Sequence, residues 1–131
     1  MNVDTIRIFL HILAASIWVG GQFVLAGLVS GLRRDHRDAL PVVARGFARI
    51  AWPAFTVAVV TGVWSLLSIG TLDAGAQIAL ALKIVAVALS GAAAAAHSLS
   101  SSRLVKALGG AVGSVSAVAA LLLAVIVSTS T

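Results

Sequence analysis

The sequence contains no cysteine, no tyrosine and a single methionine among its 131 residues. Without cysteine, the chain forms no disulfide bond and offers no thiolate to a metal ion. Charged residues are scarce too, at 10% of the chain, where a soluble domain has about a quarter. The net charge of +5 is carried by residues between long apolar segments rather than by one basic patch, so we expect no nucleic-acid partner.

Apolar residues take the place of the missing charges. They make up 60% of the chain, and the mean hydropathy is +1.11. A helix needs roughly 20 apolar residues to cross the hydrocarbon core of a bilayer, so uncharged intervals of this length predict membrane-spanning helices. The first interval is longer than the apolar core of a signal peptide, and we expect it to be retained. Four spans are predicted, at approximately 8–30, 50–71, 76–98 and 107–128, and the third is an exception because it includes the charged Lys83.

The distribution of positive charge predicts how these spans are oriented. The loop between the second and third spans contains no Lys or Arg, and neither does the C-terminus. The positive-inside rule therefore places the first and third loops in the cytoplasm and both termini outside. Short connections favour an antiparallel up-down arrangement, so we predict an all-α membrane protein with one four-helix domain over residues 1–131. The basic residues of the first and third loops are Arg33, Arg34, Arg37, Arg45, Arg49, Arg103 and Lys106.

Prolines and paired glycines give local expectations. The first loop contains Pro41 and is expected to hold a short interfacial helix, and Pro53 is expected in the first turn of the second span. Two GxxxG motifs, at residues 27–31 and 109–113, permit close approach of helix backbones. We expect them to serve packing within the chain, and homodimer formation is the alternative.

A few polar residues interrupt the apolar spans. His11, Trp18 and Gln22 follow helical spacing and therefore share one face of the first span. Lys83 and His97 share a face of the third span, and ionisable residues in a membrane usually face the bundle interior. At 1.5 Å per residue, Lys83 is level with His11 in the outer half of the bundle, and so is Trp64 near the outer end of the second span, whereas His97 lies about 21 Å further in. His11 and His97 are therefore not expected to ligate one metal ion.

Each of these residues has a structural and a functional interpretation. The spans contain no carboxylate for Lys83, which leaves snorkelling to the surface or pairing with an anion such as a porphyrin propionate or a lipid phosphate. His11 either makes a hydrogen bond between helices or binds a cofactor. Trp18, Gln22 and Trp64 either pack and anchor the helices or line the same site.

The stretches "LHILAASIWVGGQF", "RGFARIAWPAFTVAVVTGVWSLL" and "LALKIVAVALSGAAAAAHS" resemble, in this order, the membrane domain of the copper-resistance CopD family. That family has a His followed by Trp and Gly in its first helix, an Arg-Phe-x-Arg-like entry to the next, and a Lys in a later span. The related HemJ-type protoporphyrinogen oxidases share the four-helix pattern and bind b-type haem. Their third span carries His-x-Lys, where this chain has Ala81-Leu82-Lys83, and their last helix carries an Asn-Glu pair that this chain lacks.

The resemblance implies a multi-pass protein of the cytoplasmic (inner) membrane of a prokaryote, with copper movement across it as the function. Copper(I), however, favours soft thiolate and thioether ligands. The local chemistry favours haem b, with His11 as axial ligand, Lys83 facing a propionate, and Trp18, Gln22 and Trp64 lining the slot. A HemJ-like oxidase and a small accessory subunit of a larger membrane complex are the alternatives. An enzymatic role is the less favoured outcome.

Overall fold

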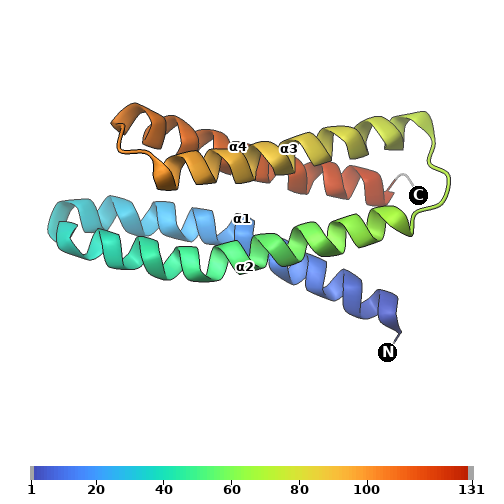
Figure 1. Ribbon diagram of the computed structural model, residues 1–131, viewed down its shortest axis with the longest axis horizontal. Coiled ribbons are helices and arrows are strands. Elements are labelled where there is room, and N and C mark those ends of the chain that lie inside the picture. Colours follow the sequence, from blue (N-terminus) through green and yellow to red (C-terminus); the bar gives the residue numbers. More distant parts are fainter. Residues whose placement is uncertain (1, 130–131) are drawn as a thin grey trace. The chain divides into compact units, whose positions relative to one another are not determined.

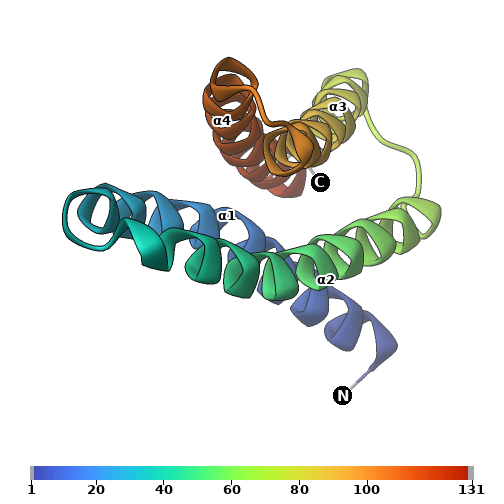
Figure 2. The same ribbon diagram turned by 60° about the vertical axis from the view of Figure 1, so that its left-hand side comes forward.

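The computed structural model describes residues 2–129, and this part of the chain consists of helices and short connections, with no strand. Its long helices are each of a length and composition that can cross a membrane, which confirms the predicted number of spans. Figures 1 and 2 show these helices from two directions, coloured in chain order. The elements are α1 (Val3–Asp35), a single 3-10 turn η1 (Arg37–Ala39), α2 (Leu40–Leu67), α3 (Ala74–Leu99) and α4 (Arg103–Thr129).

Side-chain caps define where two of the helices begin. The Asn2 side chain accepts a hydrogen bond from the backbone N–H of Thr5 at 2.8 Å, and the Asp73 side chain accepts one from that of Ala76 at 2.8 Å. Each cap satisfies a backbone donor that has no partner in the first turn of a helix. The starts of α1 and α3 are therefore each fixed by one polar side chain directly before the helix.

The first loop differs from the sequence-based prediction. Instead of a separate interfacial helix there is only η1, because α1 continues through its arginines to Asp35 and α2 begins at Leu40. Pro41 falls in the first turn of α2, where a missing backbone N–H costs little. The prediction for Pro53 was wrong, since this residue lies inside α2 rather than in its first turn.

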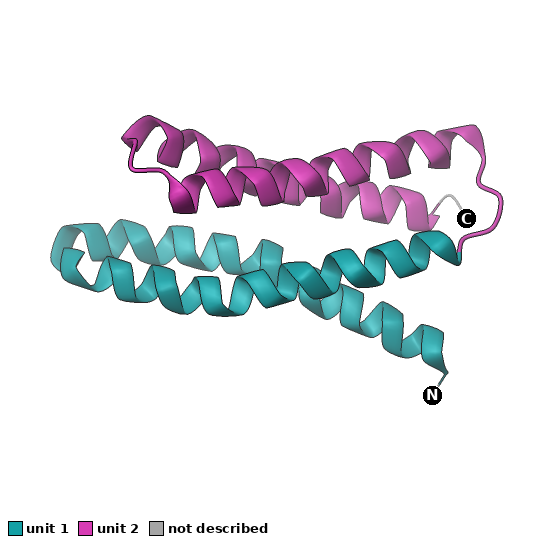
Figure 3. Ribbon diagram, viewed as in Figure 1, with its two compact units in different colours: residues 1–68 teal, residues 69–131 magenta. Residues whose placement is uncertain are grey.

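The chain divides into two compact units, residues 1–68 and residues 69–131 (Figure 3). We call them the first hairpin, which contains α1 and α2, and the second hairpin, which contains α3 and α4. In the first hairpin the early part of α1 meets the late part of α2, as the bond between His11 and Thr61 shows. Further along α1, Trp18 meets Phe55. This order of contacts is that of two helices folded back on each other.

Small residues set the packing of the second hairpin. A Cβ atom added to Gly109 would lie 2.8 Å from the carbonyl oxygen of Ala93, so the two backbones approach too closely for any larger residue. Ser90, which is buried, donates a hydrogen bond from its hydroxyl to the carbonyl oxygen of Gly113 at 3.1 Å. The motif at 109–113 therefore packs α4 against α3, as expected. At Gly27 and Gly31 an added Cβ would meet nothing within 4 Å, so the same motif in α1 makes no comparable contact among the described residues.

Large apolar side chains are mostly exposed on the helices. Phe9 and Phe23 are each about 60% exposed, whereas buried positions are taken largely by alanine. This distribution is the reverse of a soluble core and is suited to helices whose outer surfaces contact lipid. The exposed surface therefore supports contact with a bilayer.

Candidate functional site

The candidate site is built around His11 of α1 and Thr61 of α2. Nδ1 of His11 lies 2.9 Å from the Thr61 hydroxyl oxygen, and Thr61 is only 5% exposed. His11 belongs to the polar face of α1, and Thr61 belongs to an apolar stretch of α2 that contains no charge. The bond therefore joins the two helices of the first hairpin.

The hydrogen bonding of Thr61 determines which nitrogen of His11 carries the hydrogen. A threonine hydroxyl has one hydrogen, and the Thr61 oxygen lies 2.6 Å from the carbonyl oxygen of Val57 and 3.2 Å from that of Ala58. That hydrogen is directed to the backbone of α2, so toward His11 the hydroxyl accepts. Nδ1 of His11 is then the donor, and in the neutral form of the ring the lone pair resides on Nε2.

A glycine makes room for the imidazole ring. Gly62 follows Thr61 in α2, and a Cβ added there would lie 3.2 Å from Cε1 of His11 and 3.7 Å from its Nδ1. The ring therefore lies close against the backbone of α2, held on one side by a hydrogen bond. Together these contacts fix both the position and the tautomer of His11.

An aromatic cluster lies further along the same pair of helices. The ring of Trp18 is centred 4.5 Å from that of Phe55 and 5.5 Å from that of Trp52. Trp18 is 6% exposed, so it is part of the packing between α1 and α2. Gln22, one turn beyond Trp18 on α1, is half-buried. Two of the predicted site residues thus share the helix face of His11, and Trp18 packs in the hairpin core.

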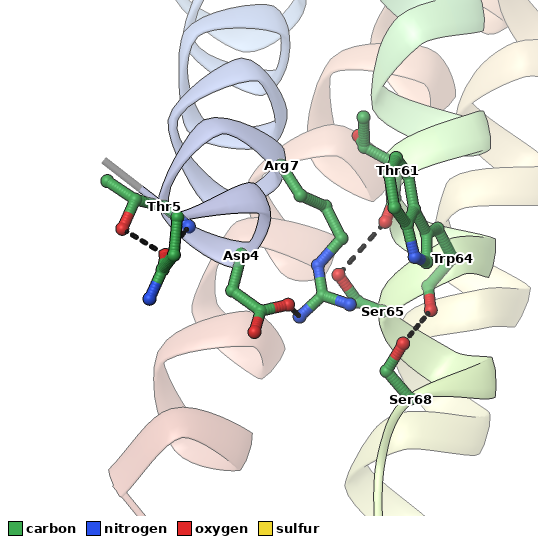
Figure 4. A network of polar contacts seen from close by, with 8 residues as sticks. Asp4, Thr5, Arg7, Thr61, Trp64, Ser65 and Ser68 are labelled. Carbon is green, nitrogen blue, oxygen red and sulfur yellow. Dashed lines mark hydrogen bonds and ion pairs between the residues drawn. The ribbon is translucent and has the colours of Figure 1, made fainter.

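Trp64 lies one helical turn beyond the level that the sequence predicted. It follows Thr61 by one turn of α2 and is 47% exposed. The guanidinium carbon of Arg7 lies 5.8 Å from the centre of its ring, and Figure 4 shows the two side chains next to each other. Trp64 is therefore level with Arg7, whereas His11 bonds to Thr61, one turn earlier in α2. Arg7 in turn pairs with Asp4, at 3.1 Å between Nη2 and Oδ1.

Arg7 is the residue that the sequence-based reasoning missed. An arginine at the edge of a membrane span usually extends its charged end to the surface, yet the side chain of Arg7 is only 11% exposed. The signal was present in the sequence, because Arg7 precedes His11 by four residues and so shares its helix face. The polar face of α1 therefore begins one turn before His11.

Lys83 and His97 belong to the second hairpin. Lys83 is half-buried in α3, and no carboxylate of residues 2–129 forms an ion pair with it. Its predicted position level with His11 stays a prediction, since the two residues lie in different hairpins. His97 donates from Nδ1 to the carbonyl oxygen of Lys106, at the connection between α3 and α4. Within the described residues there is no group of three or more His, Cys, Asp or Glu side chains that could hold a metal ion.

Residues 2–129 contain four helices that are long and apolar enough to cross a membrane, as expected of a multi-pass membrane protein. Comparison of the chain with protein-family models, with curated proteins and with solved structures gave no match. The chemistry of the first hairpin is therefore the basis for any statement of function.

Proposed function

We propose that this membrane protein binds b-type haem, or a closely related metalloporphyrin, through Nε2 of His11. The observation that carries the proposal is the hydrogen bond between Nδ1 of His11 and the Thr61 hydroxyl, at 2.9 Å. Histidines that ligate metals generally donate their other ring N–H to a neighbouring acceptor, which fixes the tautomer and the ring orientation. His11 has this arrangement, and it lies in an apolar helix where an imidazole is otherwise costly.

The donor set fits a porphyrin better than a bare copper ion. Haem iron is commonly held by one proximal histidine, because the porphyrin itself supplies four nitrogen ligands. A copper(I) site needs several ligands from the protein and favours sulfur. The chain has no cysteine, its single methionine, Met1, lies outside the described residues, and those residues contain no three-ligand group. Copper transport remains the second candidate, supported by the CopD resemblance.

The proposal assigns roles to further residues of the predicted site. Haem bound at His11 would supply redox or ligand-binding chemistry at its iron. Thr61 orients the imidazole, and Gly62 keeps the space beside the ring open. Trp18 packs the two helices together beyond the site. In an antiparallel four-helix bundle with both termini outside, Lys83 would lie level with His11 and pair with a propionate.

Replacing Lys83 by methionine separates the haem and copper proposals. If Lys83 pairs with a propionate, Lys83→Met should weaken haem retention, whereas Lys83→Arg, which keeps the charge, should weaken it less. If copper passes this level, removal of the positive charge should leave transport intact or raise it. Haem content and copper tolerance of cells that express each variant provide the measurement. Improved copper tolerance in Lys83→Met, with no haem detected in any variant, would rule out haem binding.

The proposed orientation in the cytoplasmic membrane predicts which positions are accessible from outside. Because the chain has no cysteine, single cysteines can be placed at Ser30, Ser101 or Thr131. An impermeant thiol reagent added to intact cells should label the variant at Thr131, a position outside the described residues, and leave those at Ser30 and Ser101 unlabelled. Labelling at Ser30 and Ser101 in intact cells would reverse the orientation.

A visible absorption spectrum of the purified protein tests the proposed function itself. An intense Soret band is a property of porphyrins, so it separates haem binding from copper binding and from the absence of a cofactor. The same spectrum bears on the two remaining alternatives. A HemJ-like oxidase would also show the band, and an accessory subunit without a cofactor would not.

A further inference from the structure

The guanidinium of Arg7 is largely buried, but only one of its three nitrogen atoms has a partner among the described residues. Its side chain is 11% exposed, and Nη2 forms an ion pair with Asp4. Nε and Nη1 are both buried and have no hydrogen-bond acceptor among residues 2–129. A buried donor without an acceptor is unfavourable, and more so on a charged group. Three N–H bonds of Arg7, one on Nε and two on Nη1, therefore have no acceptor within residues 2–129.

The described residues around Arg7 hold its side chain in place but do not accept hydrogen bonds from Nε and Nη1. The ring of Trp64 lies 5.8 Å from the guanidinium carbon, within the range of a cation–π contact. Ser65 and Ser68 lie on the adjacent part of α2 (Figure 4), but their hydroxyls donate to the carbonyl oxygens of Thr61 and Trp64, each at 2.9 Å. These hydroxyl hydrogens are used within α2. The guanidinium of Arg7 is therefore the charged donor that an anion would meet here.

The position of Arg7 along α1 indicates that the anion belongs to the membrane surface. Arg7 directly precedes the uncharged interval 8–32, and Trp64 lies close to the end of α2 at Leu67. A tryptophan beside the end of an apolar span is typical of the membrane–water interface, at the level of lipid head groups. Arginine presents a planar fork of donors that suits phosphate oxygens. We propose that Arg7, held by Trp64, binds the phosphate of an anionic phospholipid in the leaflet on the N-terminal side of α1.

Asp4 competes for the same guanidinium. Its side chain is 67% exposed and its oxygen lies 3.1 Å from Nη2 of Arg7. The carboxylate repels a bound phosphate, but its exposure allows it to turn away into water. Removal of its charge should therefore strengthen lipid binding, whereas a purely structural Asp4–Arg7 pair predicts no gain.

Native mass spectrometry in detergent, with phosphatidylglycerol as the probe, tests this site. Arg7→Gln should reduce retention of the lipid about tenfold, the effect of losing one strong charge-assisted interaction. Asp4→Asn should increase it, and Arg7→Lys should fall between wild type and Arg7→Gln. The matched control is Arg33→Gln, which removes an exposed charge from the opposite end of α1 and should leave retention unchanged. Equal loss in Arg33→Gln and Arg7→Gln would mean general charge attraction and would overturn the proposal.

Two control experiments show whether the ligand is a lipid or a soluble anion, and whether a loss of binding is due to misfolding. A hundredfold excess of inorganic phosphate over lipid should not displace the phosphatidylglycerol, because the acyl chains also hold it; complete displacement would mean a site for soluble anions. Helicity by circular dichroism shows whether Arg7→Gln is folded. If it is not, Asp4→Asn decides: increased retention supports the lipid site, and unchanged or reduced retention contradicts it.

Discussion

Replacing Gly109 by alanine is expected to lower the free energy of unfolding by about 1–3 kcal/mol, the usual cost of overpacking. The added Cβ would lie 2.8 Å from the carbonyl oxygen of Ala93 and 3.1 Å from both the backbone nitrogen and the Cβ of His97. Two of these three atoms belong to the backbone of α3, so no side-chain rotation relieves the contact. The helices of the second hairpin must move apart instead.

The second glycine of the motif provides the matched control. A Cβ added to Gly113 would lie 3.6 Å from the carbonyl oxygen of Ser90, which is ordinary van der Waals contact. Gly113→Ala should therefore be neutral or slightly stabilising, since alanine favours a helix more than glycine does. Denaturation in detergent followed by circular dichroism measures both variants. Tryptophan emission does not suit this test, because Trp18, Trp52 and Trp64 all lie in the first hairpin. Equal destabilisation by the two variants would contradict this account of the helix contact.

Replacing His11 by alanine is expected to abolish haem retention, because the proposal gives the iron one ligand from the described chain. His97→Ala and His36→Ala should retain most of the haem. His97 bonds to Lys106 in the second hairpin, and His36 follows the end of α1. Haem content per protein after purification provides the comparison. Equal loss from all three substitutions, or loss only from His97→Ala, would move the site away from His11.

Loss of the Thr61 hydroxyl should weaken haem binding, because this hydroxyl orients the imidazole of His11. Thr61→Val keeps the shape of the side chain and removes the acceptor for Nδ1, and loss of such a supporting bond typically weakens metal binding about 10- to 100-fold. Thr61→Ser keeps the hydroxyl and serves as the control. If Thr61→Val retains haem as tightly as wild type, the bond does not orient a ligand.

The four spans were predictable from the sequence because length and apolarity alone determine whether a helix can cross a bilayer. The start of α3 was marked by Asp73, whose side chain caps the first turn. The loop after α1 was less predictable. The arginines before His36 suggested a polar connection, but arginine is a good helix former, and α1 therefore continues to Asp35.

The site was only partly predictable, because contacts between helices depend on their register. His11 stood out as an imidazole in an apolar span, whereas Thr61, its partner across the hairpin, carries no distinguishing pattern in the sequence. Depths estimated from residue counts place Trp64 level with His11. In the structure Trp64 contacts Arg7, which lies one turn before His11. The motifs at 27–31 and 109–113 are identical in form, and only the geometry of α4 against α3 shows which one packs.

The central claim, that His11 binds a porphyrin, is tested most directly by the visible absorption spectrum of the protein purified from haem-supplied cells and then titrated with haem. We predict a Soret band in the wild type that is lost in His11→Ala and kept in His97→Ala. A wild-type protein that shows no Soret band after purification and gains none beyond free haem on titration would contradict the claim.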